Sequence, residues 1–248
     1  MFGLFKRKPS EPVFKGNYSG LQTDMHSHLL PGIDDGAPDL DTSVQLIKGM
    51  MELGYQKFIT TPHIYPDLYP NTRQTIEQAH TLLMQRLQEE QLNVTLKAAA
   101  EYFVDEQFPE RIDKGEQLLT LHKNWVLFEV SFVSPPADLA DTIFKMIVAG
   151  YQPVLAHPER YSFYHYKKEV FQRFKDQGCL LQVNLLSLLG YYGKSVQETA
   201  RMLVKEQMVD LIGTDLHHIR HLQTMNHPLL MAEVHALLQS GKILNPIL

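Results

Sequence analysis

The feature that most constrains this chain is a regular alternation of short apolar segments with helical segments between residues 21 and 240. The apolar segments are as short as strands whose two faces are both covered. Parallel strands require helical crossovers, because the chain must return before the next strand can begin. The alternation therefore predicts an α/β fold, as a closed or nearly closed barrel of parallel strands. An open, doubly wound sheet is the alternative.

The expected elements divide the chain into an arm and one domain. The seven expected strands cover residues 21–28, 57–61, 94–103, 125–132, 153–156, 180–184 and 209–213. The expected helices cover residues 39–54, 71–91, 137–150, 167–178, 194–208 and about 227–240. Residues 1–20 are interpreted as a flexible N-terminal arm and residues 21–248 as a single domain.

The composition argues against several broad classes of protein. The formal net charge is -5 over 248 residues, which argues against a nucleic-acid surface. Cys179 is the only cysteine, so no internal disulfide can form and a reducing, cytoplasmic compartment is expected. No apolar run reaches the roughly 20 residues of a membrane-spanning helix, so no integral membrane segment is expected.

The pattern Asp24-x-His26-x-His28 ends the first expected strand. Side chains alternate between the faces of a strand, so these three point the same way. Two imidazoles in such positions can bind one metal ion, and a carboxylate beneath them can orient a ring through its second nitrogen. The turn that follows, Pro31 to Gly36, is typical of loops that present catalytic side chains. Taken alone, the pattern fits two surface histidines equally well.

Histidines and acidic residues also lie at or near the ends of the later strands. The candidate ligands are His26, His28, Asp35, His63, Glu101, Glu129, His157, Asp215 and His217. In an α/β barrel the carboxyl ends of the strands meet at one mouth, where active sites are found. So many ligand-type side chains require metal ions or tight pairing to offset their desolvation. They are too many for one ion and fit two or three, and the mixture suits Zn²⁺, Mn²⁺ or Fe.

The remaining histidines and Glu129 also fit purely structural roles, and the motifs of several other enzyme classes are missing. The remaining histidines are expected at the surface or at helix caps: His80, His122, His165, His218, His221, His227 and His235. Glu129 also fits a lone buried acid, although charged side chains are seldom buried without a partner or ligand. A cysteine-dependent tyrosine phosphatase requires an arginine six positions after its cysteine, where this chain has Leu185 after Cys179. The G-x-x-x-x-G-K-[ST] and G-x-S-x-G motifs are absent from the sequence.

Together these residues resemble the PHP (polymerase and histidinol phosphatase) superfamily over about residues 21–240. The matching motifs, in order, are Asp24-Met25-His26-Ser27-His28, Thr61-Pro62-His63, Ala100-Glu101, Phe128-Glu129, Ala156-His157-Pro158-Glu159-Arg160-Tyr161 and Gly213-Thr214-Asp215-Leu216-His217. Within the superfamily, the turn Ile33-Asp34-Asp35-Gly36 and the block from His157 to Tyr161 are similar to bacterial manganese-dependent protein-tyrosine phosphatases of capsule and exopolysaccharide loci.

The resemblance implies a distorted (β/α)7 TIM-like barrel with three metal ions at its C-terminal mouth. Mn²⁺ is the expected metal, with Fe or Zn²⁺ as alternatives. By the family pattern, His26, His28, Glu101 and Asp215 bind one ion; Glu101 bridges to a second ion, which also binds Glu129 and His157; Asp35, His63 and His217 bind the third. By the same family pattern, Asp24 would lie behind the ligands, and Arg160 and Arg220 would contact the phosphate.

The resemblance also implies a reaction and a partner. The substrate would be phosphotyrosine on the tail of a membrane-anchored bacterial tyrosine kinase that controls polysaccharide export. The expected location is the cytoplasm, near the inner face of the membrane, where the basic residues of the arm would keep the enzyme close to that kinase. Whether the protein forms an oligomer is left open.

Three alternatives use the same residues. A small-molecule phosphatase, such as one acting on histidinol phosphate, would have the same metal ligands. A PHP nuclease is a second alternative, against which the negative net charge argues. A non-catalytic, metal-stabilised binding module is the third, and the complete set of candidate ligands argues against it.

Overall fold

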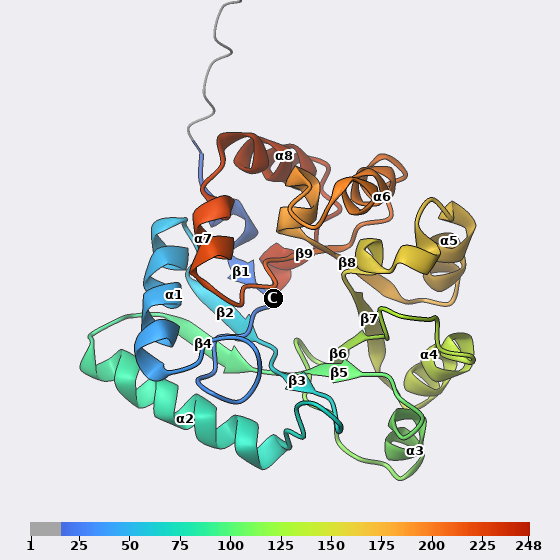
Figure 1. Ribbon diagram of the computed structural model, residues 1–248, viewed down its shortest axis with the longest axis horizontal. Coiled ribbons are helices and arrows are strands. Elements are labelled where there is room, and N and C mark those ends of the chain that lie inside the picture. The colour runs from blue at the N-terminus through green and yellow to red at the C-terminus, as the bar shows by residue number, and fades with distance from the viewer. Residues whose placement is uncertain (1–15) are drawn as a thin grey trace, which may run out of the picture.

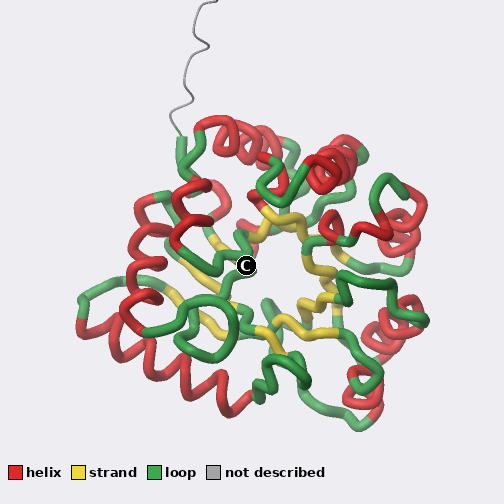
Figure 2. Tube along the Cα trace, in the orientation of Figure 1, coloured by secondary structure: helices red, strands yellow, loops and turns green. Residues whose placement is uncertain are grey.

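Short parallel strands face a common centre in the computed structural model, which describes residues 16–248 (Figure 1). The strands are β1 (Thr23–Asp24), β2 (Lys57–Thr60), β3 (His63–Ile64), β4 (Thr95–Ala98), β5 (Glu101–Phe103), β6 (Trp125–Glu129), β7 (Gln152–Ala156), β8 (Leu180–Asn184) and β9 (Leu211–Gly213). The helices are α1 (Leu40–Glu52), α2 (Arg73–Glu89), α3 (Phe108–Asp113), α4 (Leu139–Val148), α5 (Lys168–Asp176), α6 (Lys194–Lys205), α7 (Ile219–Met225) and α8 (Pro228–Gln239). Figure 2 shows the helices outside the strands.

The strands belong to two parallel sheets, ordered β1-β2-β4 and β3-β5-β6-β7-β8-β9. The expected α/β class with parallel strands is therefore confirmed. The expected continuous strand over residues 94–103 is interrupted between β4 and β5, and a matching break separates β2 from β3. Pro62 lies at that break, and proline has no N–H to donate to a ladder. Its carbonyl still accepts from the N–H of Glu101 at 3.1 Å.

The two sheets are not joined into one closed sheet, so the expected barrel closure is not confirmed. Between β1 and β9 the backbones meet only beyond the strands, where Ser27 forms a parallel bridge with Leu216. At the strands themselves the side chain of Asn245 connects the two sides. Its Nδ2 donates to the carbonyls of Thr23 at 3.2 Å and of Ile212 at 2.7 Å, and its Oδ1 accepts from the N–H of Ile212 at 2.9 Å. A side-chain amide thus replaces ladder hydrogen bonds.

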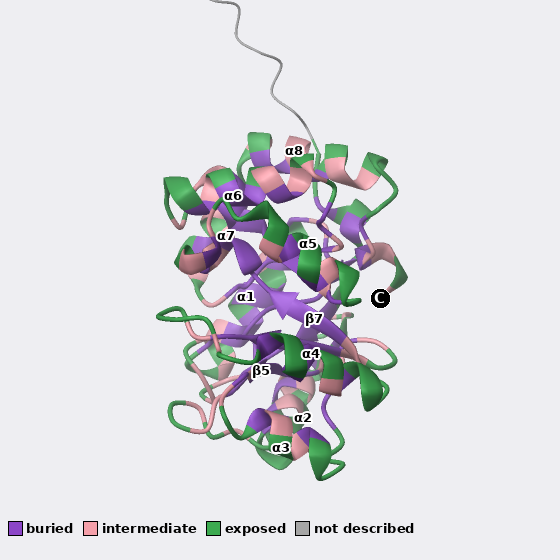
Figure 3. Ribbon diagram, turned by 90° about the vertical axis from the view of Figure 1, so that its right-hand side faces the viewer, coloured by how far each residue is buried: buried purple, intermediate pink, exposed green. Residues whose placement is uncertain are grey.

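Apolar side chains form two layers on opposite faces of the strands. Phe128 and Leu155 belong to the outer layer, against the helices. The inner apolar cluster consists of Met25, Ile59, Ala99, Leu121, Leu127, Val154, Ala156 and Leu211, all at most 5 % exposed. Figure 3 shows buried residues along the strands and exposed residues on the outer faces of the helices. Period-two alternation accounts for the division, because neighbouring residues of a strand face opposite ways.

The long helices agree with the sequence prediction to within two or three residues at each end. Asp39 caps α1 by accepting the N–H of Thr42 at 2.8 Å, and Gly54 follows the helix with a φ of 104°. The short helices α3 and α7 were not predicted, because six or seven residues are too few to show helical periodicity. Among the described residues, no helix has both the length and the apolar character to cross a membrane.

The folded region begins before residue 21. Of the expected arm, residues 1–15 lie outside the described residues. Tyr18 is fully buried, and its hydroxyl donates to the carbonyl of Met225 at 2.6 Å. Leu21 is also fully buried, so the boundary expected at residue 20 is a few residues too late.

Candidate metal centre

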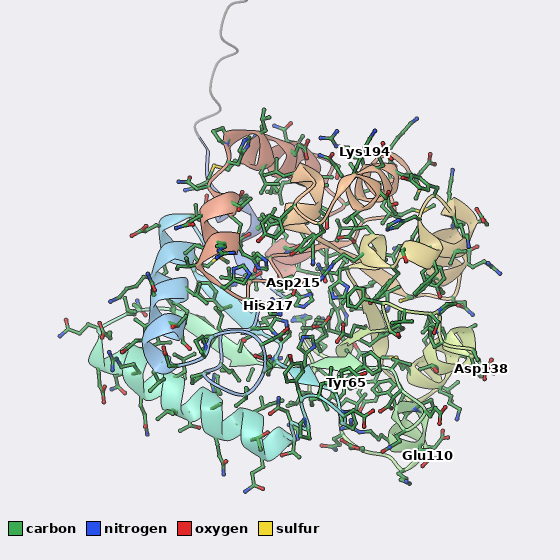
Figure 4. The ribbon with its side chains drawn as sticks, in the orientation of Figure 1. Tyr65, Glu110, Asp138, Lys194, Asp215 and His217 are labelled. Carbon is green, nitrogen blue, oxygen red and sulfur yellow. The ribbon has the colours of Figure 1, made fainter. Side chains whose placement is uncertain are left out.

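The candidate ligands come from both sheets and converge at the carboxyl ends of the strands. The backbone brings them there from the ends of β1, β6, β7 and β9, the starts of β3 and β5, and the loop before α1. Figure 4 shows Asp215 and His217 near the centre of the molecule, whereas Glu110, Asp138 and Lys194 lie at its periphery. Eight of the nine candidates are buried or nearly so, and the side chain of Asp35 is half exposed.

Glu101 lies at the middle of the cluster and is fully buried. Its Oε2 is 3.2 Å from His26 Nε2, 3.3 Å from His63 Nδ1 and 3.5 Å from His28 Nε2. Its Oε1 is 3.0 Å from His157 Nε2. One carboxylate therefore faces four imidazoles, three of them at Oε2 and one at Oε1.

The other three carboxylates each face two or more histidines of the cluster. Glu129 Oε1 is 2.9 Å from His63 Nδ1. Asp35 Oδ1 is 3.4 Å from both His63 Nε2 and His217 Nε2. Asp215 Oδ1 is 3.4 Å from His217 Nδ1. The same oxygen lies 3.5 Å from His26 Nε2 and 3.6 Å from His28 Nε2. The predicted cluster is thus assembled in one place.

This donor set fits divalent cations. Three overlapping groups have ligand atoms within 4.8 Å of one another: His28, Asp35, His63 and His217; His26, His28 and Glu101; His63, Glu101 and Glu129. Several buried atoms of the described chain have no partner in hydrogen-bond geometry, among them His28 Nε2, His63 Nδ1, Glu101 Oε1 and His157 Nδ1, although carboxylate or imidazole atoms lie within 3.0 Å of His63 Nδ1 and Glu101 Oε1. Buried polar atoms normally have partners, and bound cations would supply them for the atoms that face the cluster.

The charges of the cluster depend strongly on one another. Burial alone would raise the pKa of Glu101, but His26 and His63 outweigh it and hold that pKa well below its usual range. Burial alone would lower the pKa of His217, but Asp215 and Asp35 raise it to about 9. Without cations, these histidines therefore hold protons that compensate the carboxylates. Cations that bind there must displace protons from the imidazoles.

Gln182, on β8, fixes the orientation of His26. The His26 Nδ1–H donates to Gln182 Oε1 at 2.7 Å, and because a carbonyl oxygen only accepts, His26 Nε2 is left free for the cluster. Gln182 Nε2 in turn donates to Asn184 Oδ1 at 2.9 Å, and Asn184 Nδ2 donates to Asp215 Oδ2 at 2.6 Å. Strand β8 supplies no candidate ligand, but it orients two of them.

The sequence analysis missed Gln182 and Asn184. Both are fully buried at alternate positions of an otherwise apolar strand, and that is the signal that would have identified them. Gly213, on the adjacent β9, makes the close approach feasible. A Cβ there would lie 2.6 Å from Gln182 Nε2 and 2.7 Å from His26 Cβ.

Asp34 and a backbone carbonyl orient two further histidines. Asp34 Oδ2 is 2.8 Å from His28 Nδ1, and the carbonyl of Asp215 is 2.9 Å from His217 Nδ1. In both rings the Nδ1 atom is engaged by an oxygen acceptor, so the Nε2 atom is the one that faces the cluster. The expectation that Asp24 orients a ring is wrong. Asp24 Oδ1 accepts the backbone N–H of Thr214 at 3.2 Å, while Gln182 and Asp34 have the orienting role.

Two of the candidate ligands have unusual backbone conformations. His157 has a φ of 33° and Asp215 a φ of 50°, in the left-handed region. Residues other than glycine seldom adopt it, and such strain, about 1–3 kcal/mol per residue, is concentrated at functional sites. Both residues follow strand ends, where the chain turns its side chains toward the cluster.

Arg160 lies beside the cluster and Arg220 at the surface. The Nη1 of Arg160 donates to Asp215 Oδ2 at 2.8 Å. Its guanidinium carbon is 4.8 Å from the ring centroid of Phe132 and 4.5 Å from that of Tyr192, a cation–π contact with each. Arg220 is exposed in the first turn of α7, and its predicted contact with phosphate stays a prediction.

The other histidines only partly follow the expectation of surface or capping positions. His218 and His227 cap α7 and α8, as expected. His221, in contrast, is buried, with its Nδ1 3.4 Å from the backbone N of His217. The sequence placed it on an exposed element because the short helix α7 was not predicted.

Comparisons with known proteins agree with the family suggested by the motifs. The family model described as "Capsular polysaccharide synthesis, CpsB/CapC" matches residues 22–233. The tyrosine-protein phosphatase YwqE of Bacillus subtilis is 27 % identical over 197 residues, which cover 79 % of this chain and 78 % of the relative. The tyrosine-protein phosphatase CpsB of Streptococcus pneumoniae is 21 % identical over 201 residues, which cover 79 % of this chain and 83 % of the relative.

Solved structures show the same fold. A chain from the crystal structures of YwqE from Bacillus subtilis and CpsB from Streptococcus pneumoniae, described as unique metal-dependent tyrosine phosphatases, superposes with a TM-score of 0.75 at 25 % identity, covering 88 % of this chain and 94 % of that one. A histidinol phosphate phosphatase of Lactococcus lactis has a TM-score of 0.53 at 12 % identity, covering 89 % and 95 %, which shows likeness of fold alone. With its motifs in order and 212 consecutive residues matched, the chain belongs to the CpsB/CapC capsular polysaccharide synthesis family.

Proposed function

We propose that this chain is a metal-dependent protein-tyrosine phosphatase that hydrolyses phosphotyrosine. The observation that carries the proposal is the buried cluster of histidines and carboxylates, in which three overlapping groups can each hold a cation. Relatives that share most of the chain are named tyrosine-protein phosphatases, and the solved relatives are described as metal-dependent.

The scaffold we propose is a distorted (β/α)7 barrel. The broken strands β2–β3 and β4–β5 each count as one barrel strand in this description, which gives seven. The distortion lies at the seam between β1 and β9, where Asn245 and the bridge between Ser27 and Leu216 connect the two sides.

We assign three ions to the cluster, with Mn²⁺ as the expected metal and Fe or Zn²⁺ as alternatives that accept the same donors. The proposed ligands are His26, His28, Glu101 and Asp215 for one ion; Glu101, Glu129 and His157 for the second; and Asp35, His63 and His217 for the third. The contacts of Glu101 with four imidazoles support its place between two ions.

The proposed reaction uses the chain's own residues to bind and orient the phosphoryl group. When bound, the ions would neutralise charge on the phosphoryl oxygens and lower the pKa of the attacking water to about 7. Arg160 donates N–H groups to the phosphoryl oxygens, and its contacts with Asp215, Phe132 and Tyr192 hold the guanidinium in place. A phenolate leaving group has a pKa of about 10, so it needs less help from a general acid than an alkoxide. Arg220 is proposed as a second phosphate contact.

The proposed substrate is the phosphorylated tail of a membrane-anchored bacterial tyrosine kinase of a capsule or exopolysaccharide locus. The family match to capsular polysaccharide synthesis supports this choice. We place the enzyme in the cytoplasm near the inner membrane face, with the segment before the folded domain as the contact to that membrane.

The test is phosphate release by the purified full-length protein from a phosphotyrosine peptide and, separately, from histidinol phosphate. Each assay is run with added Mn²⁺ and with a chelator. We expect metal-dependent turnover of the peptide that greatly exceeds turnover of the metabolite. A preference for histidinol phosphate would overturn the tyrosine phosphatase assignment, and turnover that survives chelation would overturn the role of the metal.

A further inference from the structure

Phe132 is a large apolar side chain exposed at the edge of a charged site. It is 43 % exposed and lies three residues after Glu129, in the loop that follows β6. The next residue, Val133, is 90 % exposed. A benzyl side chain exposed to water beside a polar site lacks part of the apolar contact that would compensate its exposure.

The ring of Phe132 is nevertheless held in a defined place. It stacks on the His157 ring, with centroids 5.6 Å apart and an interplanar angle of 24°, and its centroid is 5.3 Å from that of Tyr161. The guanidinium carbon of Arg160 lies 4.8 Å from the ring centroid. Phe132 therefore contacts both a proposed metal ligand and the proposed phosphate-binding arginine, and the residue is still exposed.

We propose that Phe132 is a specificity-determining residue that packs against the aromatic group of the substrate, so that the site prefers aryl over alkyl phosphate esters. The inference rests on the proposed phosphatase function. A phosphoryl group held by Arg160 brings the group on its ester oxygen near the exposed side chains beside that arginine. Of the two rings that contact Arg160, Phe132 is exposed, whereas Tyr192 is partly buried. Aromatic pairs prefer offset or edge-to-face contacts, which an exposed ring can make.

Tyr192 provides an internal comparison, because it also packs on Arg160. Its ring centroid lies 4.5 Å from the guanidinium carbon, yet its aromatic neighbours are Tyr191 and His221, neither of which is a proposed ligand. The loss of the Tyr192 ring should therefore affect phosphate binding in general. The loss of the Phe132 ring should also remove a contact specific to aryl groups.

The experiment measures, by calorimetry on the metal-loaded full-length protein, the dissociation constants of benzylphosphonate and ethylphosphonate. In both ligands a methylene replaces the ester oxygen, and only the first carries an aromatic ring. The proteins compared are the unmodified chain, Phe132→Leu, Phe132→Tyr, Tyr192→Leu and the exposed neighbour control Val133→Ala. Thermal unfolding verifies that each variant is folded.

We expect Phe132→Leu to weaken benzylphosphonate by about 2- to 12-fold more than ethylphosphonate, the range for an aromatic pair. Phe132→Tyr should retain the preference for the benzyl ligand, and Tyr192→Leu should weaken both ligands by the same factor. Equal weakening of both ligands by Phe132→Leu, or no weakening of either, would overturn the inference.

Turnover of the phosphotyrosine peptide by the unmodified protein is recorded in parallel. Absence of that turnover would contradict the proposed function, whereas the ratio of the two dissociation constants reports on Phe132 alone. The two failures are therefore distinguishable.

Discussion

Two regions along the same strands, the inner apolar cluster and the candidate metal centre, satisfy their buried atoms in different ways. On β6, Leu127 belongs to the inner apolar cluster, and Glu129, two residues further on the same face, belongs to the metal centre. Both are buried. Leu127 needs only apolar neighbours, whereas Glu129 needs opposite charge.

This difference predicts that substitutions in the two regions affect different properties of the protein. The inner apolar cluster is complete within the chain, because dispersion and water exclusion need no ligand. The metal centre leaves buried nitrogens and oxygens without hydrogen-bond partners among the described residues. Substitutions in the first region should therefore lower stability, and those in the second should chiefly lower metal binding and turnover.

The largest effect is expected from the loss of a ligand. Asp215→Asn keeps the size of the side chain but removes the charge that faces the histidines and Arg160. We expect the rate of phosphate release from a phosphotyrosine peptide to fall more than about 100-fold. The reason is that loss of a residue that merely orients a metal ligand already lowers metal affinity or activity by about 10- to 100-fold. Asp138→Asn, an exposed and peripheral change, is the control. Undiminished turnover in Asp215→Asn, at equal fold content by circular dichroism, would refute the assignment.

Next in size is a cavity in the inner apolar cluster. Leu127→Ala should lower the free energy of unfolding by about 2–5 kcal/mol, as measured by urea denaturation, because the lost contacts leave a partly unfilled cavity. Leu82→Ala, on the exposed side of α2, should change it by less than about 0.5 kcal/mol. Turnover per folded molecule should remain with Leu127→Ala. Equal losses in the two variants would mean that the inner apolar cluster is not a close-packed region.

A smaller effect is expected where the orientation of a ligand changes but its identity does not. Gln182→Met removes the acceptor for His26 Nδ1 at similar side-chain length. We expect affinity for Mn²⁺, measured by competition with a chelator, to fall about 10- to 100-fold. Saturating Mn²⁺ should restore much of the turnover. Gln172→Met on the exposed face of α5 serves as the matched variant, and an affinity as high as in that variant would contradict the orienting role.

The smallest effect is expected at the single cysteine. Burial raises the pKa of the Cys179 thiol to about 12, so almost no thiolate exists at neutral pH. Turnover should survive both Cys179→Ala and treatment of the unmodified protein with iodoacetamide. Inhibition by the reagent that disappears in the variant would indicate a thiol in the reaction and undermine the metal-centred assignment.

The sequence predicted which side chains gather in the cluster better than it predicted which residues orient them. His26, Glu101 and Asp215 were identified from strand ends, because parallel strands must bring their carboxyl ends together. Gln182 and Asn184 were missed because an amide within a strand has no motif of its own. Their role depends on which side chains face them across the sheet, and that is set by register between strands distant in sequence.

The positions at which strands end also could not be predicted from the sequence alone. The sequence predicted one strand over residues 94–103, and its apolar pattern is indeed continuous. The interruption between β4 and β5 depends on the neighbouring strand, where Pro62 cannot donate to the ladder. A sequence pattern indicates only the conformation that a segment prefers by itself. A ladder of hydrogen bonds also requires donors and acceptors from a second strand.

The sequence by itself determined the α/β class, the order of the elements and the residues that gather at the strand ends, because these follow from periodicity and from the chain's own motifs. Only the tertiary structure decided how the strands meet around the centre. The seam between β1 and β9 is connected by Asn245, a residue from the end of the chain that no pattern singled out. Its importance arises from contacts across more than 200 residues, and such contacts exist only once the chain has folded.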